Sequence, residues 1–258
     1  MTDNEFVPKT TIERLIDKWW LLLVAMVLGG TLGMFVSAMR PPRYEAVALI
    51  STSIDYTFSP NLEDYEEDRA INKAGELVMS DSVLQKTLEA INSFGYEYSY
   101  QEMLNDFSLE RRDDLWTLRV TTVDAQMSAD MANAWLEEAY LQLEEAFTNA
   151  QEAYTLTEYL SSLEDCLQAD AEEASQYALC NENSFEAIYE EIERVTEIRN
   201  QKLIKSRAQY PAVRYSVVRK ATPPVMPSLN QQGVIVLSAS FLGLLAAIVF
   251  ITILPIKK

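Results

Sequence analysis

The longest hydrophobic pattern in the chain runs from about residue 124 to residue 167 and has the period of an α-helix. Apolar or small side chains recur at alternating spacings of four and three residues, which places them on one helix face. The positions are Leu136, Tyr140, Leu143, Phe147, Ala150, Tyr154 and Thr157, continued by Leu156, Leu160, Leu163 and Leu167. Asp124 is the expected N-cap, and no Pro or Gly follows for more than forty residues. At about 1.5 Å per residue, such a helix would be roughly 60 Å long.

A second helical pattern follows and predicts that the long helix has an antiparallel partner. Its apolar positions are Phe185, Ile188, Ile192, Val195 and Ile198. If the chain reverses near Glu173, the two helices form a hairpin over about residues 124–209. Positions equally far from the reversal then face each other, which predicts two ion pairs, Glu152 with Arg194 and Glu145 with Lys202. Exposed pairs of this kind contribute about 0–1 kcal/mol each, so they would fix the register more than the stability.

The two cysteines are equally far from the predicted reversal. Cys166 and Cys180 each lie seven residues from Glu173, so the hairpin would bring them face to face near its tip. In an oxidising compartment the favoured interpretation is a disulfide bridge across the hairpin. Two unpaired thiols, or one intermolecular pair, are the alternatives that the sequence leaves open.

Uncharged apolar stretches at both ends of the chain predict two membrane-spanning helices. Residues 19–39 and 233–256 carry no charge and can each cross a hydrocarbon core of about 30 Å. We expect a cytoplasmic N-terminus (1–18), a transmembrane helix (19–39), an extracytoplasmic domain (40–230), a second transmembrane helix (231–256) and a cytoplasmic C-terminus (257–258). Small residues at spacing four predict close packing of the two helices, although ordinary glycine frequency would also explain them. They are Gly29, Gly33, Ala239, Gly243 and Ala247.

Between the membrane segments, strand and helix patterns alternate. Runs rich in β-branched residues predict strands at 44–53, 107–111, 115–123 and 213–220, and shorter helices are expected at 71–78, 83–91 and 99–106. The predicted fold class is therefore an α+β membrane protein. Two transmembrane helices flank an extracytoplasmic α/β domain that carries a long antiparallel helical hairpin.

The negative charge of the chain is concentrated in the middle domain. The net charge is −18, and residues 40–230 carry 35 acidic and 16 basic side chains. Residues 120–193 hold 18 carboxylates and no Lys or Arg. Such a surface disfavours nucleic acid and anionic lipid headgroups as partners. Positive charges around the membrane segments are nearly balanced, so the outside placement rests on the rule that long loops translocate regardless of flanking charge.

Three closely spaced prolines precede the second membrane segment, at Pro223, Pro224 and Pro227. Proline has no backbone N–H and favours extended geometry. The favoured interpretation is a rigid connector that fixes the angle between the final strand and the second membrane helix. A simple helix-start signal is the alternative, because Pro is common in the first turn of helices.

The sequence lacks the residues that most catalytic or metal sites need. There is no His, which excludes His-based triads and His-containing metal sites. Apart from Gly233, at the start of the second apolar stretch, only Gly75 and Gly95 lie outside the interior of the membrane helices, so no phosphate-cradling loop is expected. Adjacent carboxylates such as Glu137 and Glu138 arise by chance in so acidic a domain. We therefore expect no enzyme activity, no cofactor and no metal.

An ordered set of segments carries a family resemblance. Between the two membrane segments these are 41–46 (PPRYEA), 77–84 (LVMSDSVL), 118–125 (LRVTTVDA) with Ala129, Ala132 and Asn133 downstream, and 221–227 (ATPPVMP). Together they resemble the Wzz-type chain-length determinants, the polysaccharide co-polymerases, over nearly the whole chain. Two features depart from the family pattern: residues 228–232 (SLNQQ) replace the usual basic residue before the membrane, and the long helix is unusually acidic.

The resemblance implies a non-enzymatic regulator of surface polysaccharide chain length in the bacterial cytoplasmic (inner) membrane. It implies a homo-oligomeric ring that works beside a membrane polysaccharide polymerase using polyprenyl-linked glycan. Only Lys257 and Lys258 follow the second membrane segment, so we expect no fused tyrosine kinase and count a separate cytoplasmic kinase among the partners, with the lipid bilayer. The alternative function is a structural or assembly subunit of another cell-envelope complex that uses the same fold. An extracytoplasmic sensor fits less well, because no output segment follows Ile256.

Overall fold

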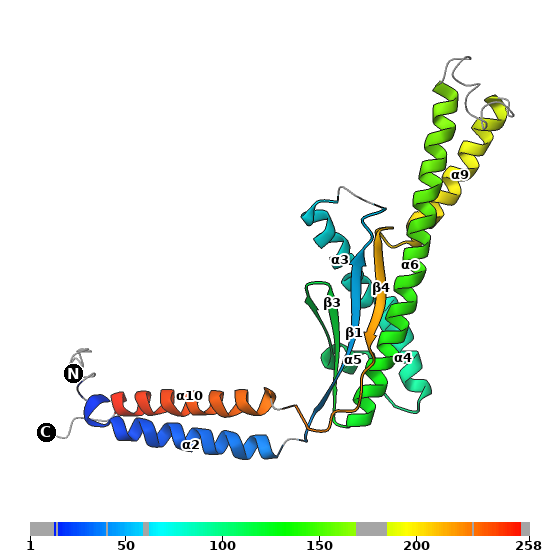
Figure 1. Cartoon of the computed structure of the whole chain (residues 1–258). Coiled ribbons are helices and arrows are strands. Elements are labelled where there is room, and N and C mark those ends of the chain that lie inside the picture. Colours follow the sequence, from blue (N-terminus) through cyan, green and yellow to red (C-terminus); the bar gives the residue numbers. More distant parts are fainter. Residues whose placement is uncertain are drawn as a thin grey trace, which may run out of the picture. The chain divides into compact units, whose positions relative to one another are not determined.

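The structure is a computed structural model that describes residues 13, 15–39, 41–58, 62–168, 185–228 and 230–253 (Figure 1). The chain divides into two compact units. One comprises Met1–Tyr44 and Met226–Lys258, and the other comprises Glu45–Val225.

The first unit is a pair of packed apolar helices, α2 (Trp19–Ala38) and α10 (Asn230–Ile253). Both contain a stretch long and apolar enough to cross a membrane, with mean hydropathies of 2.2 and 2.8. Only 11% and 6% of these stretches are buried, whereas the core helix of a soluble protein is mostly buried. Length, composition and exposure therefore all fit helices that face lipid.

Glycines bring the backbones of α2 and α10 into direct contact. A Cβ on Gly29 would collide with the Ala239 carbonyl oxygen, and a Cβ on Gly243 would lie 3.3 Å from the Gly29 Cα. At Gly33 a Cβ would lie 2.6 Å from the Ala239 Cβ. Ala247 lines an apolar groove beside this contact. The close approach needs residues without side chains at these positions, as the spacing of small residues predicts.

The second unit is built on a four-stranded sheet of order β2-β3-β1-β4. Its strands are β1 (Tyr44–Ile54), β2 (Phe107–Arg112), β3 (Leu115–Thr122) and β4 (Val213–Arg219). Strands β2 and β3 form an antiparallel hairpin, and β1 pairs antiparallel with β4. Thr52 lies beside Asp114, and Glu45 lies beside Arg119, so β1 and β3 also run in opposite directions.

The buried face of β1 is not the one that carries Val47 and Leu49. Val47 and Leu49 are the larger side chains, yet Ala46, Ala48 and Ile50 are the ones that are buried, and Val47 and Leu49 lie half-buried on the opposite face. Ala46, Ala48 and Ile50 belong to the same buried core as helix residues such as Ala132 and Trp135. Strand patterns therefore predict the alternation, whereas the packed partner decides which face is inner.

Three short helices complete the α/β body: α3 (Asp64–Val78), α4 (Asp81–Ser93) and α5 (Tyr100–Asp106). Capping boxes open α3 at Glu63 and α5 at Ser99. In the core, the Trp135 indole N–H donates to the Val78 carbonyl at 3.1 Å, and the indole ring lies 5.1 Å from the Phe107 ring. These contacts join the long helix to α3 and to the start of β2.

The long helix α6 (Ala125–Gln168) passes the α/β body and continues beside α9 (Phe185–Lys205) as a helical arm (Figure 1). The Asp124 carboxylate accepts from the Met127 backbone N–H at 2.8 Å, which confirms Asp124 as the N-cap. Within the arm, Leu163, Cys166 and Ile188 form a small buried cluster between the two helices. Cys180 lies outside the described residues, so its predicted bridge to Cys166 stays a prediction.

The register of the helical hairpin differs from the predicted one. Lys202 forms its ion pair with Glu152, not with Glu145, and Arg194 pairs with Glu191 on its own helix, not with Glu152. Tyr159 also donates to Glu191 at 3.5 Å, and Leu163 packs with Ile188, so facing positions lie about four to eight residues further along α9 than predicted, a displacement of roughly 6–12 Å. The prediction was wrong because the register depends on where the chain reverses, and neither Pro nor Gly marks that point between residues 170 and 183.

Candidate functional site

The end of β4 is fixed to the long helix by a single asparagine. The Asn133 side-chain amide donates to the Ala221 carbonyl at 3.0 Å, and its carbonyl oxygen accepts from the Ala221 N–H at 2.8 Å. Ala221 is 6% exposed, so both of its backbone groups need partners inside the protein. One side chain satisfies both. We call Asn133 and Ala221 the connector clamp.

The connector clamp stands at the start of the proline segment. One residue before it, the Lys220 ammonium lies 2.8 Å from the Glu137 carboxylate, one helical turn after Asn133 on α6. Pro223, Pro224 and Pro227 follow, and α10 begins only at Asn230. None of the prolines lies in the first turn of α10, so the simple helix-start interpretation is wrong.

Two apolar side chains stand out from the proline segment. Val225 is 95% exposed and Met226 is 77% exposed, between Pro224 and Pro227. Further along, the Ser228 N–H donates to the Arg43 carbonyl at 2.7 Å, which ties the segment to the residues that follow α2. The proline segment therefore presents apolar side chains while hydrogen bonds hold the backbone near both of its ends.

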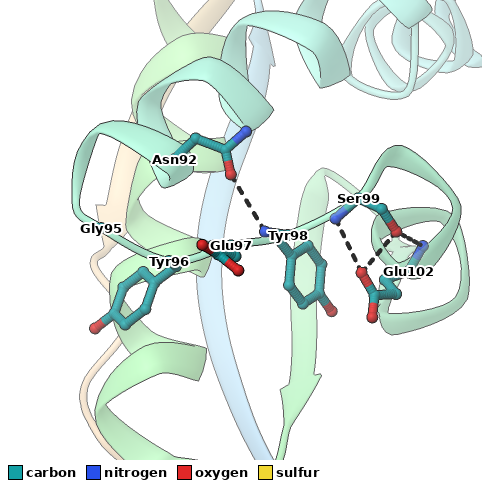
Figure 2. A pocket seen from close by; sticks show the side chains of 7 residues that line it. All are labelled: Asn92, Gly95, Tyr96, Glu97, Tyr98, Ser99 and Glu102. Atoms are coloured by element: carbon teal, nitrogen blue, oxygen red, sulfur yellow. Dashed lines mark hydrogen bonds between the residues drawn. The ribbon is translucent and has the colours of Figure 1, made fainter.

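A second candidate site is a shallow recess under the loop between α4 and α5, lined by Asn92, Gly95, Tyr96, Glu97, Tyr98, Ser99 and Glu102 (Figure 2). Gly95 turns the chain with a φ of 88°, a conformation that other residues rarely adopt. The Asn92 side chain accepts from the Tyr98 N–H at 3.3 Å, and the Ser99 hydroxyl donates to Glu102 at 2.6 Å. Most polar groups of the recess are thus engaged within the protein.

The tyrosines of this loop are tied to carboxylates on three helices. The hydroxyls donate from Tyr96 to Asp130 at 2.9 Å, from Tyr98 to Asp106 at 2.5 Å, and from Tyr100 to Asp81 at 2.7 Å. The hydrogen bond to Asp130 raises the pKa of Tyr96, and the one to Asp81 raises the pKa of Tyr100. These tyrosines hold the loop against α4, α5 and α6.

The outer face of the sheet carries a charged network. The Arg119 guanidinium contacts Glu45 at 2.6 Å and Glu110 at 2.9 Å. Arg112 and Arg119 together hold the pKa of Glu110 below its ordinary value. The network joins β1, β2 and β3 across the face that α6 does not cover.

Sequence reasoning identified the proline segment but not its anchor. Asn133 was noted only as part of a family-like segment, and no spacing rule links it to Ala221, which lies 88 residues away. The available signal was a polar amide among the buried positions Ala132, Ala134 and Trp135, because such a side chain needs a partner. Within the described residues, no group of three or more Asp, Glu, Cys or His side chains is placed to hold a metal.

Comparison with known proteins finds likeness in solved structures only. No family model and no curated protein matches the chain. A full-length bacterial polysaccharide co-polymerase is 11% identical, with 93% of this chain and 95% of that chain covered and a TM-score of 0.34. A fragment of WzzB, a polysaccharide co-polymerase from Salmonella Typhimurium, is 12% identical, with 72% and 99% covered and a TM-score of 0.27.

A third match is the wild-type lipopolysaccharide O-antigen chain-length regulator WzzBSF of Shigella flexneri. It is 12% identical, with 72% of this chain and 100% of that chain covered and a TM-score of 0.18. Each of these three structures is described as a polysaccharide co-polymerase or as a chain-length regulator.

Proposed function

We propose that this chain is a non-enzymatic regulator of surface polysaccharide chain length that acts as a homo-oligomeric ring. One observation carries the proposal. The segments 118–125 with Asn133, and 221–227, both resemble the co-polymerases, and the connector clamp joins them directly. Two separate parts of the resemblance thus form one structural unit, which supports the family interpretation beyond sequence similarity alone.

The proposed setting is the bacterial cytoplasmic membrane. There α2 and α10 cross the bilayer, both termini are cytoplasmic, and Glu45–Val225 lies outside. The ring works beside a membrane polymerase that extends polyprenyl-linked glycan, and the helical arms set the spacing around it. In the chain, the proline segment with its exposed Val225 and Met226 ends three residues before α10 begins, and in this proposal it contacts a membrane partner.

The decisive experiment is deletion of the gene in its native host, followed by separation of the surface polysaccharide on a gel. We expect the defined length distribution to become an unregulated one, and the wild-type chain to restore it. Complementation with Asn133→Ala, expressed to the same level, should restore it only in part, because the proline segment loses its anchor. An unchanged ladder after deletion would contradict the proposal and favour an assembly role in another envelope complex.

A further inference from the structure

The base of the helical arm exposes an apolar side chain inside a ring of carboxylates. Leu141 on α6 is 59% exposed, and Glu138, Glu144 and Glu145 lie one helical turn from it on either side. We call these four residues the acidic face. More than half of the Leu141 side chain is therefore left in contact with solvent, with carboxylates around it.

The C-terminal end of α9 has the opposite character. Leu203 and Ile204 are 49% and 77% exposed, whereas Ile188 and Val195 further up the same helix are buried. Lys205 and Arg207 flank the two apolar side chains, and both are exposed. We call Leu203, Ile204, Lys205 and Arg207 the basic face.

Within one chain, the acidic face and the basic face do not form ion pairs with each other among the described residues. The ion pair that joins α6 to α9 is Lys202 with Glu152. Among the described residues, no ion pair links the acidic face to the basic face: Glu145 accepts from the Gln142 amide at 3.4 Å, and Arg207 donates to the Ser82 hydroxyl. Each face therefore keeps charge and apolar surface available to a partner.

We propose that the acidic face of one copy of this chain docks on the basic face of the next copy. Each face offers an apolar centre and a charged rim. The rim charges of the two faces have opposite signs, so the acidic face is attracted to the basic face and is repelled by the many other acidic surfaces of the chain. The two faces consist of different residues, so the contact runs head to tail, the kind of contact that closes into a ring. The inference rests on the proposed ring and names the surface that forms it.

Charge reversal tests this contact in the full chain, purified in detergent or nanodiscs. Glu145→Lys and Lys205→Glu should each raise the protein concentration at which the oligomer half-dissociates by about tenfold or more, because like charges then face each other. The oligomer is measured by mass photometry. Glu89→Lys and Lys86→Glu, exposed on α4 and outside both faces, are matched controls and should leave the concentration unchanged.

Mixing the two variants separates a contact between copies from one within a copy. Glu145→Lys and Lys205→Glu chains are co-expressed with different tags. In a ring in which the two variants alternate, every contact between copies joins charges of opposite sign, whereas within each chain positions 145 and 205 carry the same sign. We expect the mixed oligomer to recover stability to within about threefold of wild type, because both reversed charges then face a charge of the opposite sign.

Three outcomes would overturn the proposal: single variants with wild-type oligomer stability, weakened single variants that mixing does not rescue, or a wild-type chain that is monomeric at every concentration. Far-UV circular dichroism of each variant verifies that the fold is intact. Failure of the proposed function looks different, because the polysaccharide ladder would then be unaffected by deletion while the mixing experiment still showed rescue.

Discussion

Asn133 engages both hydrogen-bonding groups of one buried backbone residue, so its replacement leaves two groups unsatisfied. For Asn133→Ala we expect a loss of about 1–3 kcal/mol in the free energy of unfolding, because the Ala221 N–H and C=O lose their partners. Chemical denaturation of the purified chain measures this loss. Asn200→Ala, at an exposed position of α9, is the control and should stay within about 0.5 kcal/mol of wild type. Equal effects of the two substitutions would contradict the role of the clamp.

The Tyr96 hydroxyl gives a pH-dependent contribution to stability. Its hydrogen bond to the Asp130 carboxylate raises the pKa of Tyr96 above the ordinary tyrosine value of 10.0. A group whose pKa is raised on folding stabilises the folded state below its unfolded pKa, and the stabilisation is lost as the pH rises through the folded pKa. We expect Tyr96→Phe to cost about 1 kcal/mol at neutral pH. The melting temperature of the Tyr96→Phe variant should also decline less steeply above pH 10 than that of wild type. The same decline in both proteins would rule out a pH-dependent role of the Tyr96 hydroxyl.

At the scale of single residues, the sequence predicts local roles better than distant contacts. Asp124 and Ser99 were predictable as helix caps, because a cap acts on a backbone N–H within three residues. From their spacing of two, the tyrosines at 96, 98 and 100 suit a strand edge or stacking on sugars equally well. Their actual partners, Asp130, Asp106 and Asp81, come from elements that only the folded chain brings together.

At the scale of elements, periodicity predicted the helical hairpin and the four strands. It did not predict which residues of the two hairpin helices face each other. The strands fall within two residues of their predicted bounds, since alternation is a local property. Register is set by the position of the reversal and by packing of residues such as Leu163 against Ile188. Neither can be read from a repeating pattern in an acidic stretch that lacks turn residues.

A cross-linking experiment distinguishes the observed register from the predicted one. Glu152→Cys combined with Lys202→Cys should react efficiently with a short bismaleimide, because these positions form an ion pair across the hairpin. Glu152→Cys combined with Arg194→Cys should react less. Position 194 lies eight residues along α9 from Lys202, the partner of Glu152, which is a distance of about 12 Å along the helix. The variants that carry only one of the two new cysteines are the controls for background cross-linking. More product from the second pair would show that the arm adopts the other register.

The contact between α2 and α10 can be tested with two glycines of the same helix. Gly243→Ala places a Cβ against the Ala25 carbonyl, whereas nothing lies within 4 Å of a Cβ at Gly233. We expect Gly243→Ala to lose about 1–3 kcal/mol in a denaturing-detergent titration. Gly233→Ala should be neutral or slightly stabilising, because Ala is favoured over Gly in helices by up to about 1 kcal/mol. Indistinguishable titrations would mean that close packing does not hold the pair together.

At the scale of the whole molecule, the charge distribution differs between the outer end of the helical arm and its base. In the proposed oligomer, the outer ends would repel one another, whereas the bases would attract. The outer half of the arm exposes Glu158, Glu164 and Asp165 on α6, together with Glu186, Glu190 and Glu193 on α9. Basic residues begin only at Arg194 and gather toward the C-terminal end of α9. In the proposed ring, identical arm ends repel one another, and the acidic and basic faces at the base attract. The sequence alone showed this asymmetry, but not which basic residues remain outside ion pairs.

Salt should therefore affect the two ends of the arm with opposite signs. The screening length falls from about 30 Å at 0.01 M salt to about 3 Å at 1 M, so repulsion between exposed arm ends vanishes over this range. The triple variant Glu158→Gln, Glu164→Gln and Asp165→Asn should tighten the oligomer at low salt and match wild type at high salt. Lys205→Glu should instead weaken the oligomer most at low salt, where the reversed charge is least screened. Half-dissociation concentrations measured across the salt series verify both trends, and a triple variant that is indistinguishable from wild type at low salt would show that the arm ends do not approach one another.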